Sequence, residues 1–234
     1  MKATFRKREQ LTDSISTFWF EPERPLRFTA GQFTELTLKH AKPDDRGMKR
    51  WFTISSSPTD DLVGITTKFA GEASSSFKKA LFDLAPDTEV QLAEAMGDFV
   101  LPKLTQQPLI FVAGGIGLTP FHSMFEWLAA TGETRDIRFL YAVSNEDDII
   151  FQDTFDKANV HATIIVGNPS EAWGGLRGRV DAQTILGLEK PTDDTLIYLS
   201  GPEQMIEALE ADLQKHGVDK RQLVGDFFPG YIQL

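Results

Sequence analysis

The chain has 234 residues, of which 41% are hydrophobic and 25% charged, enough for one large or two modest globular domains. It contains no cysteine, which excludes disulfides, thiolate nucleophiles and cysteine-ligated zinc or iron–sulfur clusters. Its formal charge of −10 argues against a nucleic-acid partner, because binding phosphate backbones needs clustered lysine and arginine.

The lengths of the apolar segments and the spacing of the histidines argue against membrane-spanning and metal-binding proteins. No apolar stretch reaches the roughly 18 residues that span a bilayer, and the basic N-terminus is followed by polar residues instead of the apolar segment of a secretory signal. We therefore expect a cytoplasmic protein without membrane insertion. The four histidines show no metal-ligand spacing, so no metal site is predicted.

The first half of the chain reads as a series of short strands. Runs of β-branched and aromatic residues alternate with Pro, Gly and Asp at the spacing of an antiparallel barrel. A helix beginning near Ser75 interrupts them and carries Phe77, Leu81 and Phe82 on its apolar face. The expected strands include residues 16–20, 33–38, 51–54, 63–67 and 89–92.

After a short polar connection at residues 102–107, the pattern changes to strand, helix, strand. Continuous apolar strands alternating with helices indicate a parallel sheet covered on both faces. We therefore predict a boundary at this connection, with domains at residues 1–102 and 108–234. The expected strands of the second domain lie at residues 109–112, 137–141, 162–166 and 196–199.

A glycine-rich turn follows the first strand of this second half. Gly114, Gly115 and Gly117 lead into Thr119 and Pro120, where a helix is expected to begin. Glycines accept positive φ and let a ligand reach backbone N–H groups, so the loop predicts a phosphate site. Glycine-rich turns without ligands are common, however. The spacing also departs from the dinucleotide fingerprint, because a Thr-Pro pair replaces the final glycine.

A second segment, residues 50–58, gathers a cation, aromatic rings and hydroxyls on one expected strand. A flat ligand could lie across such a strand, with a guanidinium on its phosphates and hydroxyls at its polar ring edge. An ordinary half-buried strand followed by a serine-rich turn is the alternative. Alternation divides the strand into two faces, with Arg50, Phe52 and Ile54 on one and Trp51, Thr53 and Ser55 on the other.

Together these segments resemble the ferredoxin-NADP reductase superfamily of flavoproteins. That family has an Arg-x-Phe-Thr or Arg-x-Tyr-Ser flavin motif and a Gly-Gly-x-Gly-x-Thr-Pro nicotinamide-nucleotide motif. Further matches fall in the expected order at residues 31–33, 74–77, 97–99 and 200–202, so the resemblance covers nearly the whole chain. It implies a stand-alone reductase with a six-stranded antiparallel FAD-binding β-barrel and an α/β NAD(P)H-binding domain, without an iron–sulfur segment.

The resemblance implies roles around the flavin. Arg50 would bind the FAD pyrophosphate, since arginine grips phosphate oxygens through two parallel bonds; a solvated strand-end arginine is the alternative. Phe52 would stack on the isoalloxazine ring, and the Thr53 hydroxyl would reach flavin N5. Ser75 would receive the pyrophosphate or simply cap the helix. The other residues expected at the flavin are Trp51, Ile54, Ser55, Ser74 and Ser76.

On the nicotinamide side, the three loop glycines would admit the dinucleotide pyrophosphate, and Thr119 and Pro120 would lie toward the nicotinamide. Ser200 follows an apolar strand, at the carboxyl end where open α/β sheets bind ligands. Family members often have cysteine there, and the serine would orient the ring. Gly201 and Pro202 would border the same nucleotide.

The C-terminal segment is rich in aromatic residues. Phe228 is expected to stack over the flavin face that nicotinamide approaches and to move aside when NAD(P)H binds. Phe227 or Tyr231 could take this role instead, and a terminal strand that packs its rings into the core is a further alternative.

These expectations describe an NAD(P)H-dependent flavoprotein oxidoreductase. Hydride would pass from nicotinamide to flavin N5, and electrons would go on to an acceptor such as ferredoxin, flavodoxin, another redox protein or a small molecule. Residues 144–148 carry three acids and no arginine, which favours NADH over NADPH unless Arg177 or Arg179 folds over the site. Two alternatives are a flavin reductase that uses free flavin as substrate and an electron-transfer or redox-sensing subunit of a larger complex.

Overall fold

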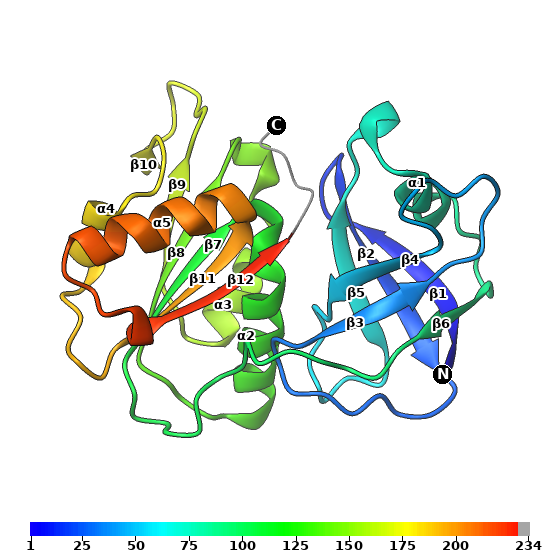
Figure 1. Cartoon of the computed structure of the whole chain (residues 1–234), viewed down its shortest axis with the longest axis horizontal. Helices are drawn as coiled ribbons and strands as arrows, with labels where there is room; N and C mark the ends of the chain where they lie inside the picture. Colours follow the sequence, from blue (N-terminus) through cyan, green and yellow to red (C-terminus); the bar gives the residue numbers. More distant parts are fainter. Residues whose placement is uncertain (229–234) are drawn as a thin grey trace. The chain divides into compact units, whose positions relative to one another are not determined.

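The computed structural model describes the backbone of residues 1–228 and the side chains of residues 1–226. The chain forms two compact units, Met1–Val100 and Leu101–Leu234. Each unit is built on its own sheet (Figure 1).

The first unit is a six-stranded antiparallel sheet in the order β4-β3-β6-β1-β2-β5, with one α-helix (Figure 1). Inward side chains such as Phe5, Phe18 and Leu36 form its core with Phe77 and Leu81 of the helix, because alternate strand positions point to the same face. Its elements are β1 (Lys2–Gln10), β2 (Ile15–Pro22), β3 (Phe33–Thr37), β4 (Lys49–Thr53), β5 (Val63–Lys68), η1 (Gly71–Ala73), α1 (Ser76–Phe82) and β6 (Glu89–Leu92).

The residues directly after β4 close this sheet into a barrel. Ser55 donates to the carbonyl oxygen of Gly64 in β5 from its backbone N at 2.8 Å and from its hydroxyl at 3.1 Å. Gly64 N donates in return to the Ser56 hydroxyl at 2.9 Å. Because β4 and β5 stand at opposite ends of the strand order, these bonds join the two edges of the sheet. The predicted six-stranded antiparallel barrel is confirmed.

Strand β1 is not among the strands predicted from the sequence. Only Ala3 and Phe5 of its nine residues are buried, and its second half is exposed and rich in charge. A strand with so few inward positions gives little hydrophobic alternation, and pairing with β2 and β6 supplies its stability instead.

The second unit is a six-stranded parallel sheet in the order β10-β9-β8-β7-β11-β12, which confirms the predicted α/β class (Figure 1). Its strands are β7 (Leu109–Gly114), β8 (Ile137–Val143), β9 (Ala162–Val166), β10 (Leu176–Arg177), β11 (Leu196–Pro202) and β12 (Leu223–Phe228). Its helices are η2 (Gly115–Leu118), α2 (Thr119–Thr131), η3 (Glu146–Asp148), α3 (Gln152–Lys157), α4 (Ala182–Leu188), α5 (Glu203–Lys215) and η4 (Lys220–Gln222).

Helices cover both faces of this sheet. Val112 of β7 belongs to the cluster that contains Ile185 of α4 and Leu209 of α5. The neighbouring position, Phe111, faces the other way and packs 4.6 Å from the ring of Phe121 in α2. This two-sided burial explains why the central strands read as continuous apolar runs.

Candidate functional site

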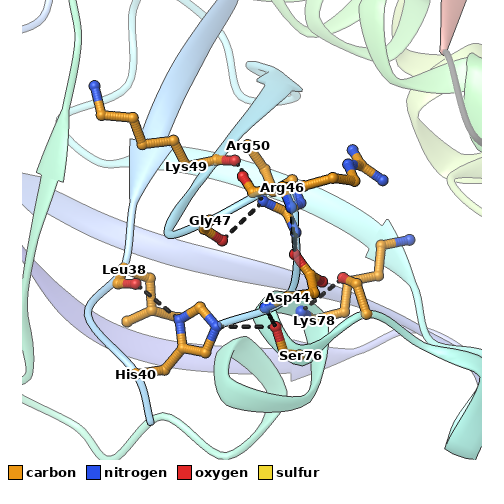
Figure 2. A network of polar contacts seen from close by, with 10 residues as sticks. Leu38, His40, Asp44, Arg46, Gly47, Lys49, Arg50, Ser76 and Lys78 are labelled. Carbon is orange, nitrogen blue, oxygen red and sulfur yellow. Dashed lines mark hydrogen bonds and ion pairs between the residues drawn. The ribbon is translucent and has the colours of Figure 1, made fainter. Parts of the chain in front are cut away.

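Arg50 of β4 holds a guanidinium that is almost completely buried, with its side chain 7% exposed. Nη1 donates to the carbonyl oxygens of Arg46, Gly47 and Lys49 at 2.9, 3.0 and 2.7 Å, and Nη2 donates to Oδ1 of Asp44 at 2.6 Å (Figure 2). Nε has no hydrogen-bond partner among the described residues. A buried cation with unused donor capacity is suited to holding an anion.

Ser76 of α1 joins the same network (Figure 2). Its hydroxyl accepts from Asp44 N at 2.9 Å and lies 3.1 Å from His40 Nε2. Burial opposes ionisation of Asp44, but hydrogen bonding and charge attraction from Arg50, with a further bond from Ser76, outweigh it and lower the pKa of Asp44. The carboxylate is therefore ionised at neutral pH and neutralises Arg50.

The alternation expected along β4 is present. Arg50 and Phe52 are buried, whereas Trp51 between them is 56% exposed. The Phe52 ring lies 5.9 Å from Phe77, in the barrel core, so Trp51 presents the exposed ring of this segment. Thr53 and Ile54 are both buried, because the chain enters the closure of the barrel at this point.

The serines predicted at the flavin all have partners within the barrel unit. Ser74 Oγ accepts from Ala70 N at 2.8 Å, and Ser75 Oγ accepts from Lys78 N at 3.3 Å as the N-cap of α1. Ser55 serves the barrel closure. Ser76, through its bond to Asp44, is the predicted serine that contacts the Arg50 network.

In the second unit, the predicted glycine loop divides into two kinds of position. A Cβ on Gly117 would stand 2.3 Å from the backbone oxygen of Ser200, so close packing requires glycine there. A Cβ on Gly114 would stand 2.4 Å from Met205 Cε, at the end of a flexible side chain that can move aside. Gly115 has φ of +53° and nothing within 4 Å of its Cβ position. The left-handed backbone at Gly115 therefore borders open space, as a phosphate cradle requires.

The end of the loop is a helix start, as predicted. Helix α2 begins at Thr119 with Pro120 in its first turn. Thr119 is 2% exposed, and its hydroxyl donates to Ile116 O at 3.1 Å. Gly201 packs against Gly114, with its Cβ position 3.2 Å from Gly114 Cα, and Pro202 Cδ lies 3.3 Å from the Cβ position of Gly114. The loop and the end of β11 thus form one packed cluster.

Ser200 of β11 is completely buried, and its hydroxyl has no hydrogen-bond partner among the described residues. In the sheet, Ser200 is paired with Ala113 of β7 on one side and with Asp226 of β12 on the other. Burial raises the pKa of Asp226 to about 6. A hydroxyl with unused bonding capacity and a carboxyl that can hold a proton are therefore neighbours at the carboxyl end of the sheet.

Sequence reasoning missed Asp44 and Asp226. Asp44 lies in a polar loop, where nothing in the sequence marks its bond to Arg50. Asp226 becomes a neighbour of Ser200 only through the pairing of β11 with β12. The prediction for the Phe228 side chain lies outside the described residues, as do those for Phe227 and Tyr231; the backbone of Phe228 ends β12.

Among residues 1–228, which the structure describes, no helix has the length and apolar character needed to cross a membrane. The same residues hold no group of three or more His, Cys, Asp or Glu side chains placed to bind a metal ion.

The clusters fit two nucleotide cofactors. Arg50, with its unpaired Nε, and Ser76 would hold the FAD pyrophosphate. Gly115, which adds no side chain to the open space beside it, would admit a nicotinamide dinucleotide, and the unused Ser200 hydroxyl would meet its polar ring edge.

The chain is similar in sequence to one protein-family model and to several known proteins. Residues 111–211 match the family model for the oxidoreductase NAD-binding domain. The chain is 29% identical over 233 residues to a flavohemoprotein of Xylella fastidiosa, with 95% of this chain and 57% of the relative covered. It is 29% identical over 224 residues to the glycine betaine monooxygenase reductase subunit of Chromohalobacter salexigens, at 90% and 59% coverage. The chain thus spans less than two thirds of the length of these relatives.

Solved structures share the whole fold. The FAD/NAD-binding domain of nitric oxide dioxygenase from Vibrio cholerae has a TM-score of 0.84 at 18% identity, covering 97% of this chain and 98% of that one. A ferredoxin NADP+ reductase from Neisseria gonorrhoeae with bound FAD and NADP has a TM-score of 0.80 at 17% identity, covering 97% and 98%. Residues 111–211 thus match an oxidoreductase NAD-binding domain, and the chain as a whole is similar in sequence and fold to FAD- and NAD(P)-binding reductases of the ferredoxin-NADP reductase type.

Proposed function

We propose that this chain is an oxidoreductase that takes reducing equivalents from a nicotinamide dinucleotide through FAD and passes them to an acceptor. The proposal rests on two groups of residues that are suited to binding phosphate. One is the Arg50 network in the barrel unit, and the other is the Gly115 loop at the carboxyl end of the parallel sheet. When bound, the two cofactors supply hydride transfer from nicotinamide C4 to flavin N5.

In the barrel unit, Arg50 neutralises the pyrophosphate and Ser76 adds a hydroxyl to it. Trp51, on the face of β4 opposite Arg50, offers an exposed ring, which suits a flat cofactor better than the covered ring of Phe52 does. The proposal also places the Thr53 hydroxyl next to flavin N5. Ile54 and the neighbouring serines would contact the flavin as well.

At the parallel sheet, Gly114 and Gly117 let the loop pack closely, and Gly115 leaves its backbone open to phosphate. Ser200 orients the nicotinamide through its unused hydroxyl. Thr119 closes the loop through its bond to Ile116 O and so fixes the loop's shape. Phe228 retains its proposed role as the ring that moves aside for the dinucleotide.

We further propose that the dinucleotide is NADH. Glu146, the first residue of η3 after β8, accepts a hydrogen bond from Ser170 N at 2.6 Å. This bond, together with a hydrogen bond to the Ser170 side chain and the charge of Arg177, lowers the pKa of Glu146. Arg177 itself donates to the carbonyl oxygens of Glu171 and Trp173 at 3.1 and 2.7 Å. A fixed carboxylate beside an arginine already held by carbonyls would repel a 2′-phosphate.

For the acceptor, we propose a redox protein or a small oxidant. One relative is named a flavohemoprotein, and another is named the reductase subunit of glycine betaine monooxygenase. The first name joins a flavin to haem, and the second pairs a reductase with a monooxygenase. The acceptor of this chain is to be identified by testing haem proteins, ferredoxins, flavodoxins and free flavin with the same preparation.

An anaerobic titration tests the proposed function. The chain is supplied with FAD, and the absorbance near 450 nm is followed while NADH is added. The proposal requires the flavin band to bleach with about one NADH per FAD, since each hydride carries two electrons. Retention of the band with both NADH and NADPH would exclude dinucleotide-dependent flavin reduction.

A further inference from the structure

We propose that Asp44 is an internal competitor for the phosphate groups of FAD, so that the chain holds FAD weakly and exchanges it with solution. This inference rests on the proposed function, because it takes the Arg50 network as the site of the FAD pyrophosphate. It predicts that FAD dissociates and rebinds instead of remaining as a tightly bound prosthetic group.

The first observation is that Asp44 uses a donor that a pyrophosphate would need. Its carboxylate accepts from Arg50 Nη2 at 2.6 Å, and its backbone N, which donates to the Ser76 hydroxyl at 2.9 Å, holds the residue next to this site (Figure 2). A carboxylate and a phosphate both recognise a guanidinium through N–H···O bonds. The two anions therefore compete for the Arg50 guanidinium.

The second observation is that Asp44 is ionised throughout the neutral range. Burial opposes its charge, but the bonds and charge of Arg50 outweigh that effect, and the pKa of Asp44 is lowered. The side chain is a persistent anion, and FAD must displace it in every binding event. Breaking a charge-assisted bond costs about 1.5–3 kcal/mol, which corresponds to about 10- to 150-fold in affinity.

The third observation is that Asp44 can leave without disturbing the barrel core. It lies in the β3–β4 connection, where Lys42, Pro43, Asp45 and Arg46 are all exposed. The Asp44 side chain itself is 26% exposed, against 7% for Arg50. The arginine is thus the fixed partner, and the aspartate is the one that can move out to water.

The remaining donor of Arg50 supports the same reading. Nε is buried without a partner among the described residues, although Nη1 and Nη2 are both used. One carboxylate oxygen satisfies Nη2 only. A diphosphate brings more acceptor oxygens than Asp44 does and can satisfy Nε as well, so FAD can displace the aspartate despite the cost of breaking its bond.

The test measures FAD dissociation constants by quenching of flavin fluorescence. Asp44→Asn removes the competing charge and keeps the shape of the side chain, and we expect it to bind FAD at least tenfold more tightly than wild type. Asp45→Asn is the matched control, because it removes the same charge from an exposed neighbour in the same loop. Riboflavin, which lacks phosphate, should bind equally to all three proteins.

A double-mutant cycle completes the test. Arg50→Gln should weaken FAD binding, and Asp44→Asn should give no gain in the Arg50→Gln background, because the competition acts through Arg50. If Asp44→Asn folds poorly alone, the shift of its melting temperature by saturating FAD reports the same affinity and should exceed the shift of Asp45→Asn.

The outcomes separate the inference from the function on which it rests. Equal FAD affinity in wild type, Asp44→Asn and Asp45→Asn, with Arg50→Gln weakened, would overturn the competition and leave the FAD site intact. FAD affinity that does not respond to Arg50→Gln would remove the proposed FAD site itself. Tightening of riboflavin by the same factor as FAD would also overturn the inference.

Discussion

Gly117 and Ser200 lie so close that no side chain fits between them: a Cβ on Gly117 would stand 2.3 Å from Ser200 O. The glycine loop after β7 and the end of β11 are therefore one packed unit, in which two elements far apart in the sequence position each other. This contact explains why the loop carries glycine at a position that no left-handed backbone requires.

Alanine at two loop glycines should give different defects. Gly117→Ala forces the backbone of β11 to shift and should cost roughly 3 kcal/mol of unfolding free energy. Gly115→Ala meets no atom within 4 Å but strains a left-handed residue, which costs about 1–2 kcal/mol, and places a methyl group in the ligand space. Thermal unfolding and NADH titration of both variants check this. Equal loss of stability, or unchanged NADH affinity in Gly115→Ala, would contradict it.

Ser200→Ala should make the ligand-free chain more stable. The Ser200 hydroxyl is buried without a partner among the described residues, and an unsatisfied hydroxyl of this kind costs about 1–3 kcal/mol. Ser55→Ala provides the contrast, because that buried hydroxyl donates to Gly64 O and its removal should destabilise the barrel. Chemical denaturation measures both changes. In stopped-flow experiments, Ser200→Ala should also slow flavin reduction by NADH, whereas a purely structural serine would leave that rate unchanged.

Asp226 should make stability fall as pH rises through weakly acidic values. Its pKa is raised from 3.8 to about 6 in the fold, so the folded chain binds more protons than the unfolded chain between these values. Below about pH 3 both states are protonated and the burial cost is absent. Above about pH 7 it is fully present. Asp226→Asn should therefore raise the unfolding free energy at pH 7 by about 3 kcal/mol and leave it unchanged at pH 3.

Asp219 offers a control of opposite sign. Its pKa is lowered to about 2 by its bonds to Arg221, so its contribution to stability is present at pH 7 and is lost as pH falls. Asp219→Asn should therefore lower the melting temperature at pH 7. A pH-independent effect of Asp226→Asn would show that its carboxyl is solvated in the folded chain.

Glu146 should set the preference between the two dinucleotides. Glu146→Gln removes the charge and should lower the ratio of kcat/KM for NADH over NADPH by about tenfold. Asp156→Asn, an exposed acid on α3, should leave the ratio as it is. Steady-state rates with both dinucleotides decide the matter, and an unchanged ratio in Glu146→Gln would place the 2′-hydroxyl elsewhere.

Much of this arrangement was predictable from the sequence. Alternation along β4 predicted that Arg50 and Phe52 share one face, which is buried in the structure, and the run from Leu109 into the glycines predicted a strand, a turn and a helix start. Both signals are local, because the periodicity of a strand and the conformational freedom of glycine act over a few residues.

The parts that escaped prediction depend on long-range pairing or on loop conformation. The sequence predicts that Ser55 contacts the flavin, whereas in the structure its hydroxyl donates to Gly64 O of β5 and helps to close the barrel. Asp226 gains its raised pKa from burial beside β11, which sequence separation conceals. Asp44 stands only six residues from Arg50, but the fold of the loop between them decides that the two side chains bond.

The central claim is that this chain moves hydride from NADH to FAD, and anaerobic single-turnover spectroscopy tests it most directly. Wild-type chain mixed with a limiting amount of FAD should lose its absorbance near 450 nm when NADH is added, and Arg50→Gln at the same FAD concentration should bleach a smaller fraction. Wild-type absorbance that stays constant with both NADH and NADPH would contradict the account.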